Sequence, residues 1–314
     1  MHTAQSPAPL HLRLPATSAN LGAAFDTAAV AFDFALEIEA SIAMETSIEA
    51  TGRNVAECSR IEDNLILDTC RALLAREGRT APPLALRMHN AIPLGMGCGS
   101  SAAGRLAAVA LAVHFGALDW SGERILAEAA ALEGHPDNVA ACWHGGLVVA
   151  ADGEVPARLP LVSISPPDSW RAILALPSRP LATSHARAVL PDAWSRADVV
   201  ANLQAAALLA PAFAAGRTDL LAVATRDRLH QPYRSAICPL LDPLLPLVGR
   251  DGIHSVTLSG AGPSVLLIAQ ADTAPALTAI VGALHDVPLE RDRDYELLIA
   301  GFVSFGAARD WSVR

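Results

Sequence analysis

The sequence predicts a protein of two domains that contains both β-strands and α-helices. Its 314 residues exceed the usual length of a single domain. Short runs of alternating apolar residues, typical of half-buried strands, are interspersed with longer apolar runs typical of helices. Glycine, proline and short polar residues follow the apolar Leu147–Ala150 over residues 152–167, which indicates a boundary between domains. We therefore predict domains of residues 1–160 and 161–314.

Composition excludes several classes of function. The net charge of −9 argues against a nucleic-acid partner. No purely apolar run has the length of a membrane span, and residues 1–9 do not resemble a signal peptide, so we expect no membrane partner. The five cysteines are widely spaced and lack a Cys-x-x-Cys motif, which indicates reduced thiols in a cytoplasmic protein. All 23 basic residues are arginine, which excludes any chemistry that requires a lysine.

The first domain begins with two predicted strands, Leu10–Leu14 and Phe32–Ala40. Residues 15–27 between them read Pro-Ala-Thr-Ser-Ala-Asn-Leu-Gly-Ala-Ala-Phe-Asp-Thr. By composition alone, Asn20 and Asp26 fit turn and cap positions as well as they fit a binding site. Further on, Asn64 immediately precedes an apolar helix that ends near residues 77–78, so its simplest role is that of a helix cap.

A glycine-rich stretch, residues 92–103, follows a third predicted strand, Leu84–Met88, and leads into an alanine-rich helix that ends at Phe115. Ser100 is the expected N-cap of that helix. Glycine lets the backbone approach a ligand closely, and the free N–H groups at a helix start favour anions, so the stretch predicts a phosphate site. No Gly-Lys-Ser/Thr motif is present. Ser100 also stands where a dinucleotide-binding fingerprint has its third glycine, although Asp119 lies at the distance of a ribose-binding acid.

Another polar segment follows a helix that we expect over residues 123–132, with Ser121 as its cap and Gly134 as its stop. It reads Glu133-Gly-His-Pro-Asp-Asn138-Val-Ala. No second histidine lies at a metal-binding spacing, so a transition-metal site is not favoured. Mg²⁺ prefers one or two carboxylates together with phosphate oxygens, and one glutamate with a loop serine would suit it.

The second domain is predicted to contain the strands Arg171–Leu176, Ile253–Leu258, Val265–Ala269 and Tyr295–Phe302. Helices are expected at Asp198–Ala215, where Pro211 should kink or divide the helix, and at Ala274–His285. The segment 226–234 is rich in arginine, which ordinarily indicates a solvated face. A glycine turn at residues 259–263 joins two of the strands.

The glycine-rich stretch resembles the phosphate loop of the GHMP kinases, and Ser259-Gly-Ala-Gly-Pro263 resembles their third motif. Cys98 replaces the usual leucine of the loop. The resemblance implies that ATP binds at the loop, with Mg²⁺ held partly by Ser101. The predicted cofactor-binding residues are Pro93, Leu94, Gly95, Met96, Gly97, Cys98, Gly99, Ser100, Ser101, Ala102 and Ala103, together with Asn64 at the adenine.

Within that family, the segments at residues 15–26 and 133–140 resemble the signatures of homoserine kinases, although Ala23-Ala24 stand in place of Pro-Gly. The resemblance implies a substrate site of Asn20, Asp26, Asn138, Arg187, Arg234 and Gly260, and it places Asn138, Asp26 and Thr183 at the reacting groups. It makes Glu133 a metal ligand, with Glu128 one helical turn earlier as the alternative. Asn138 cannot act as a base, so either Asp26 or solvent and the phosphate accept the hydroxyl proton.

The resemblance implies an α+β fold, with a first domain like ribosomal protein S5 domain 2 and a ferredoxin-like second domain. It implies ATP- and Mg²⁺-dependent phosphorylation of the side-chain hydroxyl of L-homoserine, in threonine biosynthesis, and it makes a homodimer plausible. Three alternatives stay open. They are another GHMP kinase that acts on threonine or an isoprenoid alcohol, an NAD-binding dehydrogenase that uses Gly95, Gly97 and Asp119, and an inactive regulatory relative.

Overall fold

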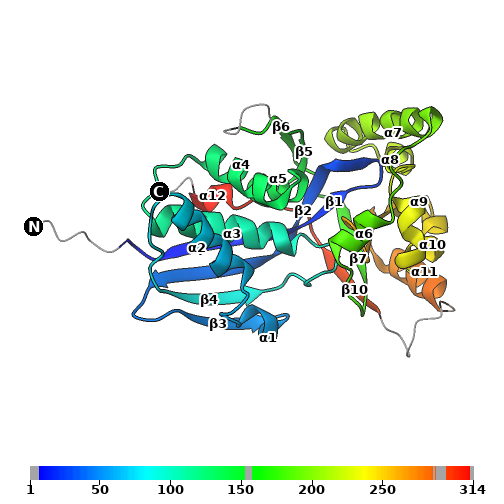
Figure 1. Ribbon diagram of the computed structural model, residues 1–314. Helices are drawn as coiled ribbons and strands as arrows, with labels where there is room; N and C mark the ends of the chain where they lie inside the picture. Colours follow the sequence, from blue (N-terminus) through cyan, green and yellow to red (C-terminus); the bar gives the residue numbers. More distant parts are fainter. Residues whose placement is uncertain (1–6, 153–157, 286, 288–294, 312–314) are drawn as a thin grey trace, which may run out of the picture.

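The computed structural model describes residues 7–152, 158–285, 287 and 295–311, and it has two halves, each built on one sheet (Figure 1). The first sheet has the order β3-β4-β2-β5-β6, with β1 paired to β2, and only β3 and β4 run parallel. Helices α2–α5 lie over one side of it (Figure 1). The elements are β1 (Leu10–Asn20), β2 (Ala24–Ile42), β3 (Ser47–Gly52), α1 (Val55–Cys58), α2 (Leu65–Arg76), β4 (Leu84–Asn90), α3 (Ser100–Phe115), α4 (Gly122–Glu133), α5 (Asp137–His144), β5 (Leu147–Ala150) and β6 (Leu161–Ile164).

The first two strands are longer than their sequence pattern predicts, and this extra length brings the predicted site residues together. β1 continues through Pro15 to Asn20, with an irregularity in its pairing to β2 between Pro15 and Thr17. A proline has no N–H to donate to a ladder, so it is tolerated at such a bulge. The alternation ends there because residues 16–20 are all buried, and a strand buried on both faces carries no alternating pattern.

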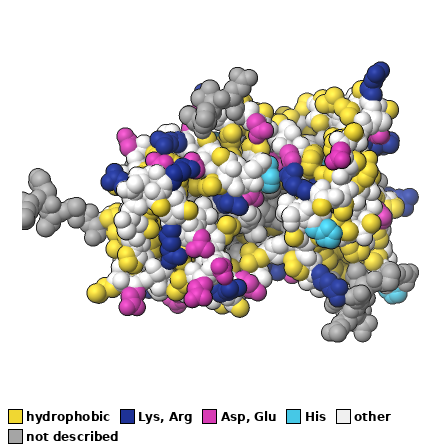
Figure 2. Space-filling view, viewed as in Figure 1, with side chains coloured by type: hydrophobic (Ala, Val, Ile, Leu, Met, Phe, Trp, Pro, Cys, Tyr) yellow, Lys and Arg dark blue, Asp and Glu magenta, His cyan; other side chains and the backbone are white. Residues whose placement is uncertain are grey.

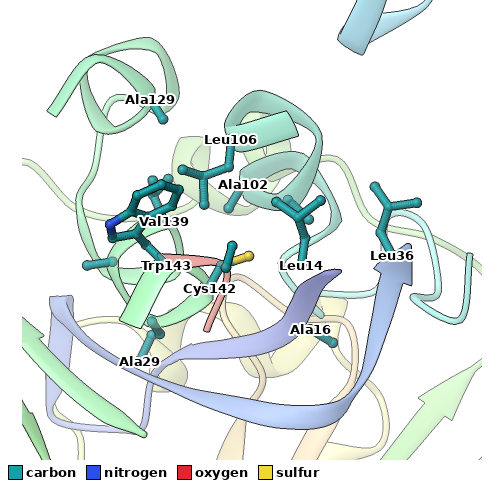
Figure 3. Close-up of a cluster of buried hydrophobic side chains, with 14 of the residues drawn as sticks. Leu14, Ala16, Ala29, Leu36, Ala102, Leu106, Ala129, Val139, Cys142 and Trp143 are labelled. Atoms are coloured by element: carbon teal, nitrogen blue, oxygen red, sulfur yellow. The ribbon is translucent and has the colours of Figure 1, made fainter. Parts of the chain in front are cut away.

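The core of the first half lies between the sheet and its helices. Figure 3 shows Leu14 and Leu36 from the strands facing Ala102 and Leu106 of α3, with Trp143 of α5 beside them. Nearly all of α3 is buried, and most of its buried residues are alanine or glycine, so neighbouring elements can approach it closely. The helix is therefore held firmly, and its N-terminus has a fixed position.

The second half has the ferredoxin-like topology implied by the resemblance. Its antiparallel sheet has the order β10-β7-β9-β8, which is the 4-1-3-2 order of a β-α-β-β-α-β unit. The chain here forms β7 (Trp170–Pro177), α6 (Thr183–Ala188), α7 (Arg196–Ala214), α8 (Thr218–Ala224), α9 (Gln231–Arg234), α10 (Leu241–Leu244), β8 (Ile253–Leu258), β9 (Val265–Gln270), α11 (Ala274–Leu284) and β10 (Tyr295–Ala300). The α+β prediction is thus confirmed for both halves.

The two halves are joined both by the packing of β7 and by the path of the chain. Strand β7 is buried on both faces, because Ala172 and Leu174 join the core of the first half while Ile173 and Ala175 join a second core with α10 and α11. After β10 the chain returns to the first sheet, where Phe302 pairs with Phe32 and α12 (Ala308–Trp311) follows. The division at residue 160 stays a prediction, and β6, just past it, pairs with β5 in the first sheet.

Helix α7 continues as one helix through Pro211, so the predicted division there is wrong, while the predicted kink stays a prediction. Among the described residues it alone is long and apolar enough, by length and composition, to cross a membrane, and 28% of its most apolar window is buried. Asn202 ties it to the first half, because its side-chain amide donates a 2.7 Å hydrogen bond to the Ala23 carbonyl. The helix is therefore anchored on the β1–β2 turn.

Candidate active site

A cleft of about 510 Å³ lies between the two halves. In Figure 2, acidic, basic and histidine side chains gather around the hollow where the halves meet. Most of the predicted site residues line this cleft, from widely separated parts of the chain. They are Asn20, Asp26, Asn64, Leu94, Gly95, Gly97, Cys98, Gly99, Ser100, Ser101, Glu133, Asn138, Thr183, Arg187, Arg234 and Gly260.

Four residues predicted to bind the nucleotide do not line the cleft. Pro93 and Met96 line a separate hollow beside Arg53 and Glu296. Ala102 and Ala103 are completely buried, because their side chains point from the first turn of α3 into the core. Contact of these four residues with the nucleotide stays a prediction, and their side chains do not line the cleft. A loop that presents its backbone to a ligand necessarily turns some of its side chains toward the protein.

In the glycine-rich loop, carbonyl groups accept hydrogen bonds from within the protein, whereas several N–H groups are left available to a ligand. The carbonyl oxygens of Gly95, Gly97 and Cys98 each accept a hydrogen bond from another part of the protein, and that of Gly99 accepts the first hydrogen bond of α3, from Ala103 N–H. In the part of the chain that the structure describes, no hydrogen bond is donated by the N–H groups of residues 97–102. These groups precede the first intrahelical bond of α3 and carry the positive end of its dipole. The loop is therefore arranged as an anion cradle.

The alternating glycines are required by the protein itself. Gly97 and Gly99 have φ values of 72° and 74°, and a Cβ on them would lie 2.0 Å from the Ser259 carbonyl oxygen and 2.0 Å from Thr17 Oγ1, respectively. These two glycines therefore allow a close approach of the loop to the β8–β9 turn and to strand β1 of the protein itself. The cap prediction is also wrong, because Gly99 occupies the N-cap position and Ser100 is the first helical residue. A left-handed backbone at this cap favours glycine over serine.

Hydrogen bonds join the motif segments around the cleft. Asn20 donates through Nδ2 to the Gly260 carbonyl at 2.7 Å, and Gly260 N–H donates to the Ala19 carbonyl at 3.1 Å. Ser259 Oγ contacts the Gly97 carbonyl at 2.7 Å and Ser18 Oγ at 2.9 Å. These hydrogen bonds therefore join the phosphate loop, the end of β1 and the β8–β9 turn along one wall of the cleft.

Ser101 and Glu133 lie together at the start of α3. Ser101 Oγ donates to Glu133 Oε2 at 2.8 Å, and Arg105 Nε donates to the same oxygen at 2.6 Å. Glu128 is paired with Arg76 at 2.8 Å and is not among the lining residues. No cluster of three or more His, Cys, Asp and Glu side chains suited to a metal occurs in the described residues. A hydroxyl and a carboxylate beside a phosphate cradle nevertheless fit Mg²⁺, which takes the rest of its ligands from phosphate and water.

Asn138 has a fixed orientation. Its Oδ1 accepts a 2.7 Å hydrogen bond from Thr17 Oγ1, which leaves the side-chain N–H groups as the donors available to the cleft. His135, a lining residue that the sequence analysis did not select, lies 3.3 Å from the buried carboxylate of Asp137. That hydrogen bond raises the pKa of His135. On this wall of the cleft the Asn138 side chain therefore presents hydrogen-bond donors.

The opposite wall carries charged side chains. Both guanidinium nitrogens of Arg187 donate to the carboxylate of Asp26, at 2.7 and 2.9 Å, and this bonding raises the pKa of Arg187. Arg234 is only 1% exposed, so the alternative that it belongs to a solvated face is wrong. Burial, followed by the nearby Arg187, lowers the pKa of Arg234. Both guanidinium groups lie over the ring of Phe25, at 5.5 and 5.3 Å from its centroid.

Two further predicted residues, Thr183 and Asn64, line the cleft from the starts of helices. Thr183 is the first residue of α6 and lines the cleft. Asn64 caps α2, because its Oδ1 accepts hydrogen bonds from Ile66 N and Leu67 N. Its Nδ2 donates to the Arg60 carbonyl and retains one more N–H. The cap is confirmed, and the contact with adenine stays a prediction.

The dehydrogenase alternative does not fit the fold. A dinucleotide-binding unit needs a parallel sheet with the glycine loop between neighbouring parallel strands. Here β4, which precedes the loop, pairs in antiparallel fashion with β2, and Asp119 is not among the residues that line the cleft. This alternative is therefore wrong.

The structure also shows residues that sequence reasoning missed, namely Thr17, Phe25, Arg105 and His230. Thr17 and Phe25 lie inside the motif at residues 15–27, so their position beside Asn20 and Asp26 could have identified them as site residues. Arg105 lies one helical turn after Ser101 and could have been found from that spacing. His230 was missed because its contacts with Gly22 and Phe25 join segments about 200 residues apart, although Asp227 and Arg234 lie only three and four residues away.

Comparison with known proteins gives consistent results. Residues 64–146 match the GHMP kinases N terminal domain, and residues 209–285 match the GHMP kinases C terminal domain. A homoserine kinase of Solibacter usitatus is 44% identical over 261 residues, which cover 82% of this chain and 84% of its own. One from Synechocystis sp. is 35% identical over 285 residues, with 89% and 92% covered. The crystal structure of homoserine kinase from Cytophaga hutchinsonii superposes with a TM-score of 0.77 at 22% identity, and 98% of each chain is covered.

Proposed function

The chain belongs to the GHMP kinase family, and from that premise we propose that its cleft transfers the γ-phosphoryl group of ATP to the side-chain hydroxyl of L-homoserine, a step of threonine biosynthesis. It is a kinase, as its curated relatives over most of its length are. One observation carries the choice of substrate. The cleft joins a backbone cradle for phosphate to a wall with two arginines and an aspartate.

The nucleotide end acts through the backbone. The N–H groups of residues 97–102 and the positive end of the α3 dipole would hold the phosphates of ATP. Carbonyl groups of the same loop accept hydrogen bonds from Thr17 of β1, Ser259 of the β8–β9 turn and Leu181 before α6, so the donors are already oriented before the nucleotide binds. Preorganised donors stabilise the charge that develops during phosphoryl transfer. Asn64 would contact the adenine through its remaining N–H.

Ser101 and Glu133 would hold Mg²⁺ beside the phosphates. When bound there, Mg²⁺ neutralises phosphate charge and aligns the transferred group. Glu133 is favoured over Glu128 because only Glu133 lines the cleft and contacts Ser101. Arg105 keeps the carboxylate of Glu133 turned toward the loop.

The amino-acid end fits a zwitterion. Asp26 and Arg187 satisfy each other in the structure, and a bound amino acid offers each of them an opposite charge. The substrate ammonium group would lie at Asp26 and Asn20, and its carboxylate would lie at Arg187 and Arg234. Thr183 at the start of α6 and the Gly260 backbone would complete this end of the cleft. A neutral alcohol such as galactose would need no such pair of arginines.

Asn138 would donate a hydrogen bond at the reacting hydroxyl, because Thr17 engages its oxygen. Both oxygens of Asp26 accept from Arg187, so Asp26 serves better as a binding group than as a base. We assign the hydroxyl proton to the transferred phosphate or to solvent. Catalysis would then rest on positioning and charge stabilisation, which phosphoryl transfer mainly requires.

The reaction needs only small-molecule partners, and we propose that the protein acts in the cytoplasm without a nucleic-acid or membrane partner. The net charge of −9 and five free cysteines, four of them buried, support this. A homodimer is compatible with the same function.

The test is ADP release with ATP, Mg²⁺ and a panel of homoserine, threonine, mevalonate and galactose. We expect turnover with homoserine well above that with the other three, and O-phosphohomoserine as the product. Preference for threonine would keep the amino-acid end of the cleft and change the substrate. Preference for mevalonate or galactose, or no turnover of homoserine, would contradict the proposal.

A further inference from the structure

His230 is completely buried next to the charged wall of the cleft, without lining the cleft itself. It directly precedes α9, which ends at Arg234, and its ring stacks on Phe25 with 5.2 Å between centroids. Its two ring nitrogens contact groups on the two halves of the molecule. Nδ1 lies 3.1 Å from Arg234 Nη1, and Nε2 lies 2.9 Å from the Gly22 carbonyl oxygen.

The chemistry of these partners determines the state of the ring. A guanidinium group can only donate, so Nδ1 must accept and cannot carry a proton. A carbonyl can only accept, so Nε2 must carry the proton. The neutral imidazole protonated at Nε2 is the single form that satisfies both contacts. Burial lowers the pKa of His230 and so favours this neutral form. The charged groups that act on the ring are Asp227, Arg234 and Asp26.

The two hydrogen-bond partners of the His230 ring, Gly22 and Arg234, belong to two different parts of the amino-acid end. Gly22 lies in the β1–β2 turn between Asn20 and Asp26. Arg234 is otherwise held by a hydrogen bond from its Nε to the Ala186 carbonyl at 2.8 Å, next to Arg187 on α6. His230 therefore joins the turn that carries the polar groups to the helix that carries a buried guanidinium.

We propose that His230 is a positioning residue for the amino-acid end of the cleft. Through Nδ1 it orients the Arg234 guanidinium toward the substrate carboxylate, and through Nε2–H it fixes the turn that presents Asn20 and Asp26. This inference rests on the proposed function for its kinetic consequence, while the state of the ring can be measured without any activity.

Two substitutions separate the two contacts. His230→Asn places an oxygen where Nδ1 lies, so it keeps the acceptor for Arg234 and loses the donor to Gly22. His230→Gln places an amide N–H near the position of Nε2, so it keeps the donor and loses the acceptor. A hydrogen bond to a charged group is worth more than one between neutral groups, so the Gln variant should raise KM for homoserine about tenfold or more and the Asn variant about two- to fivefold. In both variants, kcat and KM for ATP should stay within about threefold, because neither contact belongs to the phosphate loop.

His254→Asn is the control, because His254 is a half-buried histidine on β8, beside Trp170, with a pKa also lowered by burial. It should leave KM for homoserine unchanged. The proposal is overturned if both His230 variants behave like this control, or if the Asn variant loses as much affinity for homoserine as the Gln variant.

Nitrogen-15 NMR of the imidazole rings, with His230 assigned by its loss in His230→Asn, tests the network directly. We expect a neutral ring protonated at Nε2 that stays neutral as the pH falls through 6.5, the ordinary pKa of histidine. A ring protonated at Nδ1, or an ordinary titration, overturns the proposal even in an active enzyme. If the wild type does not turn over homoserine, the proposed function fails, while this measurement still decides the state of His230.

Discussion

The two ends of the cleft are built in different ways. The nucleotide end is made from the backbone of one continuous stretch, residues 95–102, in which the carbonyl groups of Gly95, Gly97 and Cys98 are hydrogen-bonded to other segments and the N–H groups of residues 97–102 are presented. The amino-acid end is made from side chains on the β1–β2 turn, α6 and α9, which meet only in the folded molecule. A site made of backbone needs an exact local conformation, whereas a site made of side chains needs the correct packing of the two halves.

The largest effect should follow from filling the space beside Gly97. Gly97→Ala would force a left-handed residue against the Ser259 carbonyl, with its Cβ only 2.0 Å from that oxygen. Gly78 also has a positive φ, but nothing lies within 4 Å of a Cβ there. Gly78→Ala should therefore cost about 1–2 kcal/mol of unfolding free energy, and Gly97→Ala about 4 kcal/mol or more. Urea unfolding of the two variants measures both values.

This pair of variants tests whether the nucleotide end depends on contact with the β8–β9 turn. Equal losses of stability in the two variants would show that the packing of the loop against the β8–β9 turn does not contribute to stability. The same result would indicate that glycine is needed at position 97 only so that the backbone can approach the ligand closely.

A smaller effect, on activity alone, should follow from changes at the metal ligand. Glu133→Gln keeps the shape of the side chain and removes the charge that faces Ser101. We expect the Mg²⁺ concentration at half-maximal activity to rise about 10- to 100-fold, by analogy with losses at metal sites. Glu128→Gln is the matched control, since Glu128 contacts Arg76 outside the cleft. If the control shows the larger shift, the ligand lies one helical turn earlier.

The difference between the two ends also explains what could be predicted from the sequence. The phosphate loop was recognisable because all its determinants, from Gly95 to Ser101, are contiguous and lie between a strand and a helix. Strands β8 and β9 were placed almost to the residue, since alternation and a glycine turn define them. Local patterns were enough for these elements.

The amino-acid end could not be derived from local patterns. Residues 226–234 look like a solvated arginine cluster, and the burial of Arg234 follows only from its packing against Phe25, His230 and Ala186. The resemblance identified Arg187 and Arg234, but it carried no information on His230. The extra length of β1 was also hidden, because a strand buried on both faces shows no alternation.

The smallest effect concerns the dependence of stability on pH at the amino-acid end. Burial lowers the pKa of His230, His144 and His254 from the ordinary value of 6.5. Below that pH the unfolded chain binds more protons at these sites than the folded chain, so the free energy of unfolding falls as the pH falls. The raised pKa of His135 acts in the opposite direction. In urea unfolding at pH 7.5 and 6.0, His230→Asn should lose less stability over this interval than the wild type. An equal or greater loss would contradict the assignment.

The most direct test of a cleft with two separate ends is the kinetics of Arg234→Leu with both substrates varied. Arg234 is buried at the amino-acid end, and Leu fills apolar space without introducing an unpaired charge. Arg228→Leu, at a side chain 61% exposed in the same segment, is the control. Losing a hydrogen bond to a charged group costs about 1.5–3 kcal/mol, so we predict that kcat/KM for homoserine falls about 10- to 150-fold while KM for ATP stays within about threefold. Unchanged homoserine kinetics, or an equal loss for ATP, would contradict the account.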